Sequence, residues 1–97
     1  MDTIITASRF GDQSFDGNWL DNNGLPYFPA PIAIEVIDNP LRPGITAAWL
    51  NAGLGRFRVT MPASVMSDGP HTSYFRLRAI FPDTVLDSTF RFELHVE

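Results

Sequence analysis

Apolar and polar side chains alternate with a period of two in several stretches of the chain. In the clearest stretches, centred on Phe57, Phe75 and Phe90, apolar residues are interleaved with arginine, threonine or glutamate. Successive side chains of a strand point to opposite faces, so this alternation is typical of strands with one buried and one solvated face. It predicts three strands over a shared core. The residues expected to face that core are Phe57, Val59, Met61, Phe75, Leu77, Ala79, Phe90, Phe92, Leu94 and Val96.

Further stretches predict additional strands. Ile32, Ile34 and Val36 share one face of a fourth strand, and 15–19 forms a fifth, with weaker candidates at 4–10 and 46–50. Turn-forming residues separate the stretches, and the eight prolines argue against long helices. About seven short strands at this spacing predict an all-β antiparallel β-sandwich.

Two segments carry a resemblance to a known class of domain. Residues 55–62 (Gly-Arg-Phe-Arg-Val-Thr-Met-Pro) form a strand that ends in a proline, and 67–72 (Ser-Asp-Gly-Pro-His-Thr) form a turn that starts the next strand. Together with Phe15-Asp16-Gly17-Asn18-Trp19, these segments resemble bacterial and phage immunoglobulin-like domains. The resemblance covers mainly the chain after Pro31. It implies an immunoglobulin-like sandwich that serves as a surface, adhesive or virion part, and it brings no catalytic residues.

Composition narrows the class of protein. A length of 97 residues suits one domain spanning 1–97. The chain has no cysteine, which excludes disulfides, thiolate chemistry and cysteine-type zinc sites. A net charge of −4 argues against nucleic-acid binding, which depends on a basic surface.

The sequence also bears on location. The N-terminal residues include an early acid and no long apolar run, so they do not form a secretory signal. No stretch approaches the roughly 20 apolar residues that a membrane helix needs. We therefore expect the product in a virion or the host cytoplasm, and not in a membrane.

All seven basic residues are arginines, and several alternate along the predicted strands. If these strands lie side by side in one sheet, their arginines form one outward surface that binds a partner's carboxylates in forked geometry. The alternative is a solvated sheet face whose arginine stems cover the apolar layer. The candidate partner-binding residues are Arg56, Arg58, Tyr74, Arg76, Arg78 and Arg91.

Acidic and amide side chains gather between residues 12 and 23. Asp12, Asp16, Asn18 and Asp21 supply the oxygen ligands that Ca²⁺ prefers. Their spacing departs from that of an EF-hand, because Leu20 occupies a ligand position. The alternative is a polar turn whose side chains bond to their own backbone. The calcium site is a weak candidate, and we expect no cofactor.

Aromatic residues outside the clearest strands form a weak ligand-binding candidate. These are Trp19, Tyr27, Phe28 and Trp49, of which Tyr27 and Phe28 lie between two prolines in a predicted loop. Exposed coplanar rings stack on sugars, whereas buried ones build the core, as tryptophan commonly does in sandwiches. For the two tryptophans we favour the core.

Nothing in the chain predicts catalysis. Neither His71 nor His95 has a metal-ligand partner at a suitable spacing, and the serines near His71 lack the sharp turn and oxyanion site of a nucleophile. Glycine-rich phosphate loops are also absent. We therefore predict that the chain is not an enzyme and has no catalytic residue.

Two functions remain. The first is a small phage virion component, such as a head-decoration, head–tail or tail protein, that docks onto a larger assembly. Its partner is a protein, and self-association is one form of that contact. The alternative is a carbohydrate-binding or adhesion module that uses the loop aromatics to bind a glycan. We favour the first, because sugar-binding modules are usually exported or fused to an enzyme.

Overall fold

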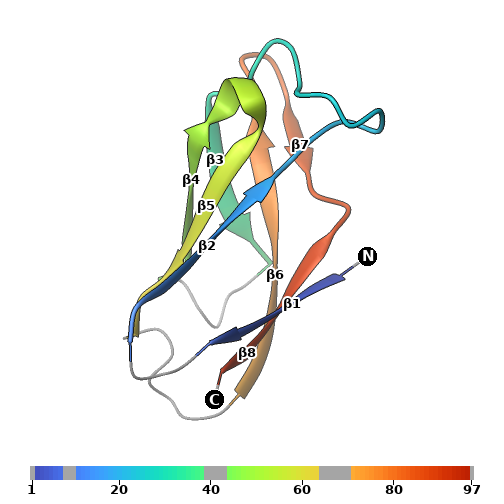
Figure 1. The fold of residues 1–97 in the computed structure, drawn as a ribbon. Coiled ribbons are helices and arrows are strands. Elements are labelled where there is room, and N and C mark those ends of the chain that lie inside the picture. The colour runs from blue at the N-terminus through green and yellow to red at the C-terminus, as the bar shows by residue number, and fades with distance from the viewer. Residues whose placement is uncertain (1, 8–10, 39–43, 64–70, 97) are drawn as a thin grey trace.

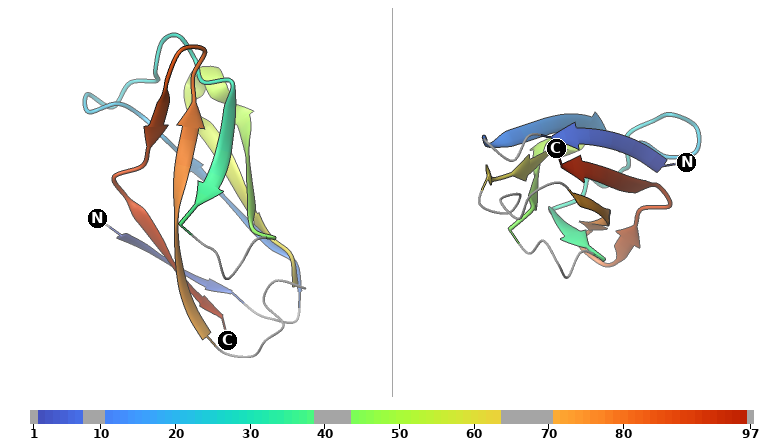
Figure 2. Two further views of the ribbon diagram at one scale, coloured as in Figure 1. Left: turned by 180° about the vertical axis from the view of Figure 1, so that it is seen from behind. Right: turned by 90° about the horizontal axis from the view of Figure 1, so that it is seen from below.

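The computed structural model describes residues 2–7, 11–38, 44–63 and 71–96, which form strands and one short 3₁₀ helix (Figure 1). Figure 2, in the view from below, shows the strands arranged in two layers. The elements in chain order are β1 (Asp2–Ala7), β2 (Gln13–Asn18), β3 (Ala33–Ile37), β4 (Thr46–Asn51), η1 (Ala52–Leu54), β5 (Arg56–Met61), β6 (His71–Ile80), β7 (Val85–Asp87) and β8 (Arg91–Val96).

The strands divide into a three-stranded and a five-stranded sheet. The three-stranded sheet has the order β2-β5-β4 and is antiparallel. The five-stranded sheet follows β1-β8-β6-β3, and β7 pairs with β6 beyond the end of β8. All its pairs are antiparallel except β1 with β8, which run parallel with Asp2 opposite Arg91 and Ala7 opposite Val96.

These connections are those of an immunoglobulin-type sandwich. In that arrangement the second, fifth and fourth strands share one sheet, and the third, sixth and last share the other. The constant-type version pairs the first strand with the second, whereas here β1 joins the last strand, β8. Within the described residues, the outer edge of β2 therefore has no neighbouring strand.

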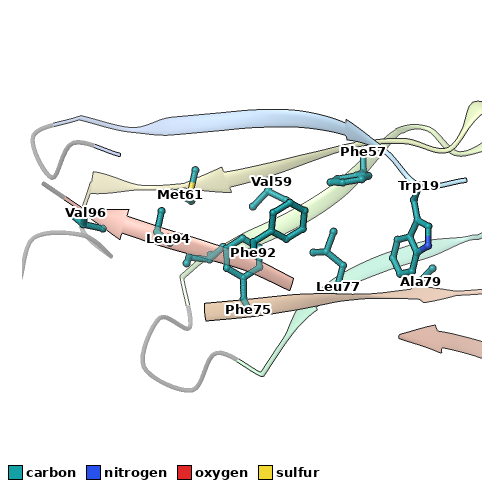
Figure 3. Close-up of a cluster of buried hydrophobic side chains, with 11 residues drawn as sticks. Trp19, Phe57, Val59, Met61, Phe75, Leu77, Ala79, Phe92, Leu94 and Val96 are labelled. Carbon is teal, nitrogen blue, oxygen red and sulfur yellow. The ribbon is translucent and has the colours of Figure 1, made fainter. Parts of the chain in front are cut away.

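The core lies between the two sheets and is rich in aromatic rings (Figure 3). Phe75, Leu77 and Leu94 have no exposed surface, and the rings of Phe75 and Phe92 stack with centroids 5.1 Å apart. The expected inward faces of β5, β6 and β8 are confirmed, with Phe90 only partly buried. The buried apolar residues are Trp19, Ile45, Phe57, Val59, Met61, Phe75, Leu77, Ala79, Phe92, Leu94 and Val96.

One predicted inward residue is exposed. Ile34 and Val36 pack against the core, but Ile32 is 67% exposed, so its expected place on the same face is wrong. The physical reason is that β3 begins only at Ala33. Ile32 precedes the strand and belongs to the loop, although its backbone N–H still donates to the carbonyl of Ile80 at 2.7 Å.

A short strand that was not predicted, β7, precedes the last predicted strand, and Ser88 lies in the segment between β7 and β8. The Ser88 side chain is 1% exposed. Its Oγ accepts from the backbone N–H of Leu77 at 3.1 Å and donates to the carbonyl of Phe90 at 2.7 Å. The hydroxyl thus bonds to backbone groups between the part of β6 that pairs with β8 and the part that pairs with β7, and β7 is a strand beyond the about seven expected.

Candidate functional site

The predicted arginine surface is divided between the two sheets. Arg56 and Arg58 lie on β5 in the three-stranded sheet, whereas Arg76 and Arg78 lie on β6 in the five-stranded sheet. Arg91 follows on β8, next to β6. The expectation of one surface is therefore wrong. β5 and β6 follow one another in the chain, but they lie in different sheets. The outward orientation of these side chains agrees with the alternation.

Carboxylates of the same chain already engage several of these arginines. Arg58 binds Asp16 through two contacts of 2.8 and 3.2 Å across β2 and β5. Arg78 binds Asp87 in the same forked manner at 2.6 and 3.1 Å and reaches Glu35 at 3.5 Å. These hydrogen bonds hold the pKa of Asp16 and of Asp87 below the ordinary value of 3.8.

The remaining arginines differ in their surroundings. Arg76 donates to Asp38 at 2.6 Å and to the backbone carbonyl of Ser88 at 3.3 Å. The guanidinium of Arg91 lies 4.4 Å from the ring centroid of Tyr74, a cation–π geometry. The guanidinium groups of this sheet thus serve contacts within the molecule, which is the role expected of a solvated sheet face.

The four candidate calcium ligands do not come together in the structure. Asp12 accepts from the backbone N–H of Ala63 at 2.8 Å, and Asp21 accepts from the N–H groups of Asn23 and Leu25 at 2.8 and 3.0 Å. Asp16 pairs with an arginine, as described above, and Asn18 ends β2. Among the described residues, no group of three or more histidine, aspartate or glutamate side chains is placed to hold a metal ion. The polar-turn interpretation fits these contacts.

Both tryptophans belong to the interior. Trp19 is 5% exposed, and its ring lies edge-on to Phe90 with centroids 5.3 Å apart. Trp49 is half-buried on β4 and donates its indole N–H to the carbonyl of Ala33 at 2.8 Å, which links the two sheets. Both rings therefore pack in or against the core, as expected for the tryptophans, and the loop candidates that remain are Tyr27 and Phe28.

Phe28 is the most exposed large apolar side chain of the described residues. It is 98% exposed, whereas the adjacent Tyr27 packs edge-on to Phe81 with ring centroids 5.5 Å apart. Together with Val85 and Leu86 these aromatic residues line a mainly apolar hollow. The sequence did not lead us to expect that residues 81–86 line this hollow. The available signal was the Pro82-Asp83 turn, which lies between apolar residues.

Other exposed apolar side chains gather at the same end of the sandwich. We call this the loop end, which comprises residues 19–32, 52–55 and 81–84, at the top of Figure 1. An exposed apolar group of this kind marks a contact surface more often than scattered single residues do. The exposed large apolar residues at or beside the loop end are Leu20, Leu25, Phe28, Ile32, Leu50, Leu54 and Val85.

The histidines and the helices add little to the site. His95 contacts Glu93 at 2.8 Å on the outer face of β8, and the side chain of His71 lies outside the described residues. The described part of the chain contains no helix of the length and apolarity that a membrane crossing requires.

Comparison with known proteins supports the fold. No family model and no curated protein matches the chain. One similar solved structure is described as "Chimeric titin Z1Z2 functionalized with a KLER exogenous peptide from decorin", with a TM-score of 0.58 and 17% sequence identity. The alignment covers 99% of this chain and 44% of that chain. At this identity the likeness concerns the fold alone, and it confirms the immunoglobulin-like sandwich.

Proposed function

We propose that this chain is a non-enzymatic interaction module that docks onto a partner protein through its loop end. The observation that supports this proposal is the position of Phe28, which is 98% exposed beside an apolar hollow. Exposing a phenylalanine ring to water is unfavourable by about 25 cal/mol per Å² of apolar surface. Covering the ring with a partner recovers this free energy.

The arginines fit this role less well than the loop end does. Arg58, Arg76 and Arg78 already bind carboxylates of their own chain at 2.6–2.8 Å. A partner would have to displace these pairs before it gained its own. We therefore place the main contact at the loop end and assign to Arg56, Tyr74 and Arg91 a supporting role at most.

The specific form of the proposal is docking onto a larger assembly. A small phage virion component, which decorates a head or joins a head or tail, is the form that we favour. Its support is the resemblance of 55–72 to phage immunoglobulin-like domains and the added stability that a small domain gains from a covered surface. A glycan-binding module is the alternative, favoured by the exposed ring of Phe28 alone.

A binding selection tests the proposal. Random dodecapeptides displayed on a carrier are selected on the immobilised protein, and the chain is screened in parallel on a glycan array. The enriched peptides should bind the Phe28→Ser variant roughly tenfold or more weakly, since central aromatic residues commonly contribute that much. Ile4→Ser is the matched control, because Ile4 is 63% exposed on β1, away from the loop end.

The outcomes separate the candidate functions. Enriched peptides that bind Phe28→Ser and wild type equally would overturn the role of the loop end, and a selection without enrichment would overturn the proposal. A glycan signal that is lost in Phe28→Ser, without peptide enrichment, would favour the sugar-binding alternative.

A further inference from the structure

The free edge of β2 presents backbone groups in a known register. The N–H of Trp19 donates to the carbonyl of Gly55 at 2.7 Å, so Trp19 and every second residue before it direct their backbone groups toward β5. The intervening residues of β2 direct theirs to the opposite side, where the described part of the chain has no further strand. These residues are Ser14, Asp16 and Asn18.

A second observation places an apolar groove beside this edge. Phe15, Phe57, Phe90 and Phe92 line a hollow between β2 and the segment that precedes β8, and Gly17 belongs to its wall. Gly17 keeps the wall open, since a Cβ at this position would lie 2.6 Å from the Phe57 ring.

Two further hollows follow this one toward the loop end. A neighbouring hollow shares Asn18 and Phe90 with it, and that hollow shares Tyr27 and Leu86 with the one beneath Phe28. The shared residues place the three hollows in a row along β2 and residues 86–90, and we call this row the groove. In Figure 1, β1 lies beside β8 below this groove, and its pairing reaches only to Arg91.

The charges of the groove favour a basic partner. The charged residues that line the three hollows are all acidic, namely Asp16, Asp83 and Asp87. Asp16 and Asp87 are paired with arginines on outer faces of the sheets, whereas no hydrogen bond or ion pair of Asp83 occurs among the described residues. A cationic side chain next to Asp83 would complement the charge of this one carboxylate.

We propose that an extended segment of a partner protein adds to the free edge of β2 as a strand and fills the groove with alternate apolar side chains. The proposal rests on the proposed function, because the groove ends at Phe28. Main-chain hydrogen bonds to Ser14, Asp16 and Asn18 hold the segment, and the Phe-lined hollow selects an apolar residue. A lysine or arginine of the segment reaches Asp83.

A second copy of this chain fits the edge less well. Two β2 strands paired antiparallel about their centres would bring Asp16 of one copy close to Asp16 of the other. Like charges placed directly opposite destabilise a strand pair, although the ion pair of each Asp16 with Arg58 of its own chain weakens this repulsion. Both copies would also carry a net charge of −4, which opposes their association at low salt.

Hydrogen exchange on the wild-type chain tests the geometry without any substitution. The probe is the set of dodecapeptides enriched in the selection described above. We expect these peptides to alternate apolar and polar residues, to carry a lysine or arginine, and to slow amide exchange at Ser14, Asp16 and Asn18 by roughly tenfold or more. Protection confined to 19–32 and 81–84, with these three amides unaffected, would overturn the strand addition while the proposed function stands.

Proline substitution supplies a second test. Ser14→Pro and Asn18→Pro each remove an outward N–H without removing a bond to β5, and proline is tolerated on edge strands. Peptide affinity should fall roughly three- to tenfold for each lost hydrogen bond. Ala47→Pro is the control. The backbone groups of Arg58 point away from β2 and toward Ala48 of β4, so Ala48 directs its own backbone groups toward β5. The neighbouring N–H of Ala47 therefore points to the free edge of β4.

The remaining outcomes also decide between occupants. Equal losses in Ala47→Pro and Ser14→Pro would overturn the assignment to β2. Binding that is lost in Ser14→Pro but kept in Phe28→Ser would support the strand addition and overturn the loop end as the main contact. A chain that dimerises on its own, with protection of the same three amides, would make the occupant a second copy and overturn the partner segment.

Discussion

Phe75 has no exposed surface, while Phe28 is 98% exposed. Replacing Phe75 by alanine should lower the free energy of unfolding by about 3–5 kcal/mol, because the substitution leaves a cavity against the stacked ring of Phe92. Phe28→Ala should change it by less than about 0.5 kcal/mol, since nothing in the core is lost. Urea denaturation measures both values. Equal effects of the two substitutions would contradict the core described above.

The ion pair between Asp87 and Arg78 gives stability a defined pH dependence. The hydrogen bond from Arg78 lowers the pKa of Asp87 in the folded state below its ordinary value of 3.8. The pair therefore stabilises the fold above pH 3.8, and its contribution is lost as the pH falls through the lower folded-state pKa. Asp87→Asn should lower the melting temperature at neutral pH and leave it unchanged at strongly acidic pH.

Melting curves across this range check the prediction, with Asp83→Asn as the control. Asp83 is exposed in the turn before β7, and the described residues offer it no hydrogen bond or ion pair. Its substitution should leave the melting temperature unchanged at either pH. A loss in Asp87→Asn that persists at strongly acidic pH would show that the charge pair is not its cause.

The same residues show what alternation predicts and what it misses. A period of two correctly places Arg58 and Arg78 on outer faces, because side-chain direction is a local property of a strand. The partners of these arginines, Asp16 and Asp87, depend on which strands become neighbours. No local pattern carries that information, so an arginine surface open to a partner was expected where internal ion pairs occur.

Among the elements, the segment between β7 and β8 is held by the hydroxyl of Ser88, which bonds to two backbone groups. Ser88→Ala would leave the N–H of Leu77 and the carbonyl of Phe90 without this partner in a site that is 1% exposed. The substitution should lower the free energy of unfolding by about 1–3 kcal/mol. Ser14→Ala, at an exposed position of β2, should change it by less than about 0.5 kcal/mol.

Urea denaturation of the two serine variants gives the comparison. A stability of Ser88→Ala equal to that of wild type would mean that other groups, such as water, replace the hydroxyl. The proposed part of Ser88 in holding the segment between β7 and β8 would then be wrong.

Strands with strong alternation were predicted well, and the candidate at 46–50 matches β4, whereas the shortest strand, β7, was not predicted. β5 alternates apolar and polar residues along its whole length, and β6 does so from Phe75 to Ala79, where its strand was expected, although β6 begins earlier, at His71. β7 has only three residues, too few for a period to be recognised. Ile32 continues the alternation of β3 in the sequence but lies outside the strand, because a loop residue next to a strand can keep the pattern by chance.

At the scale of the whole molecule, most strand pairs join segments that are far apart in the chain. β1 pairs with β8, and β2 pairs with β5. Because loop closure must precede such contacts, all-β chains of this kind fold slowly. We expect refolding in about milliseconds to seconds, followed by tryptophan fluorescence after dilution from denaturant. A refolding phase of microseconds would contradict the predominance of long-range pairing.

The sandwich itself was predictable, but the assignment of strands to sheets was not. Many short amphipathic strands can bury their apolar faces only by packing two sheets together or by closing one. The sequence does not distinguish the sheet of β5 from that of β6, since both alternate apolar residues with arginines. The free edge of β2 follows from that assignment and from the choice of β8 as the partner of β1, and so it was visible only in the structure.

The parallel pairing of β1 with β8 has a mechanical consequence. Asp2 stands beside Arg91 and Ala7 beside Val96, so the outer ends of the first and last strands lie at opposite ends of the same ladder (Figure 1). A force that stretches the domain from its two termini acts along both strands in opposite directions. All the hydrogen bonds between β1 and β8 are then loaded in shear at the same time. We expect them to break together at one high force, rather than one after another at a low force.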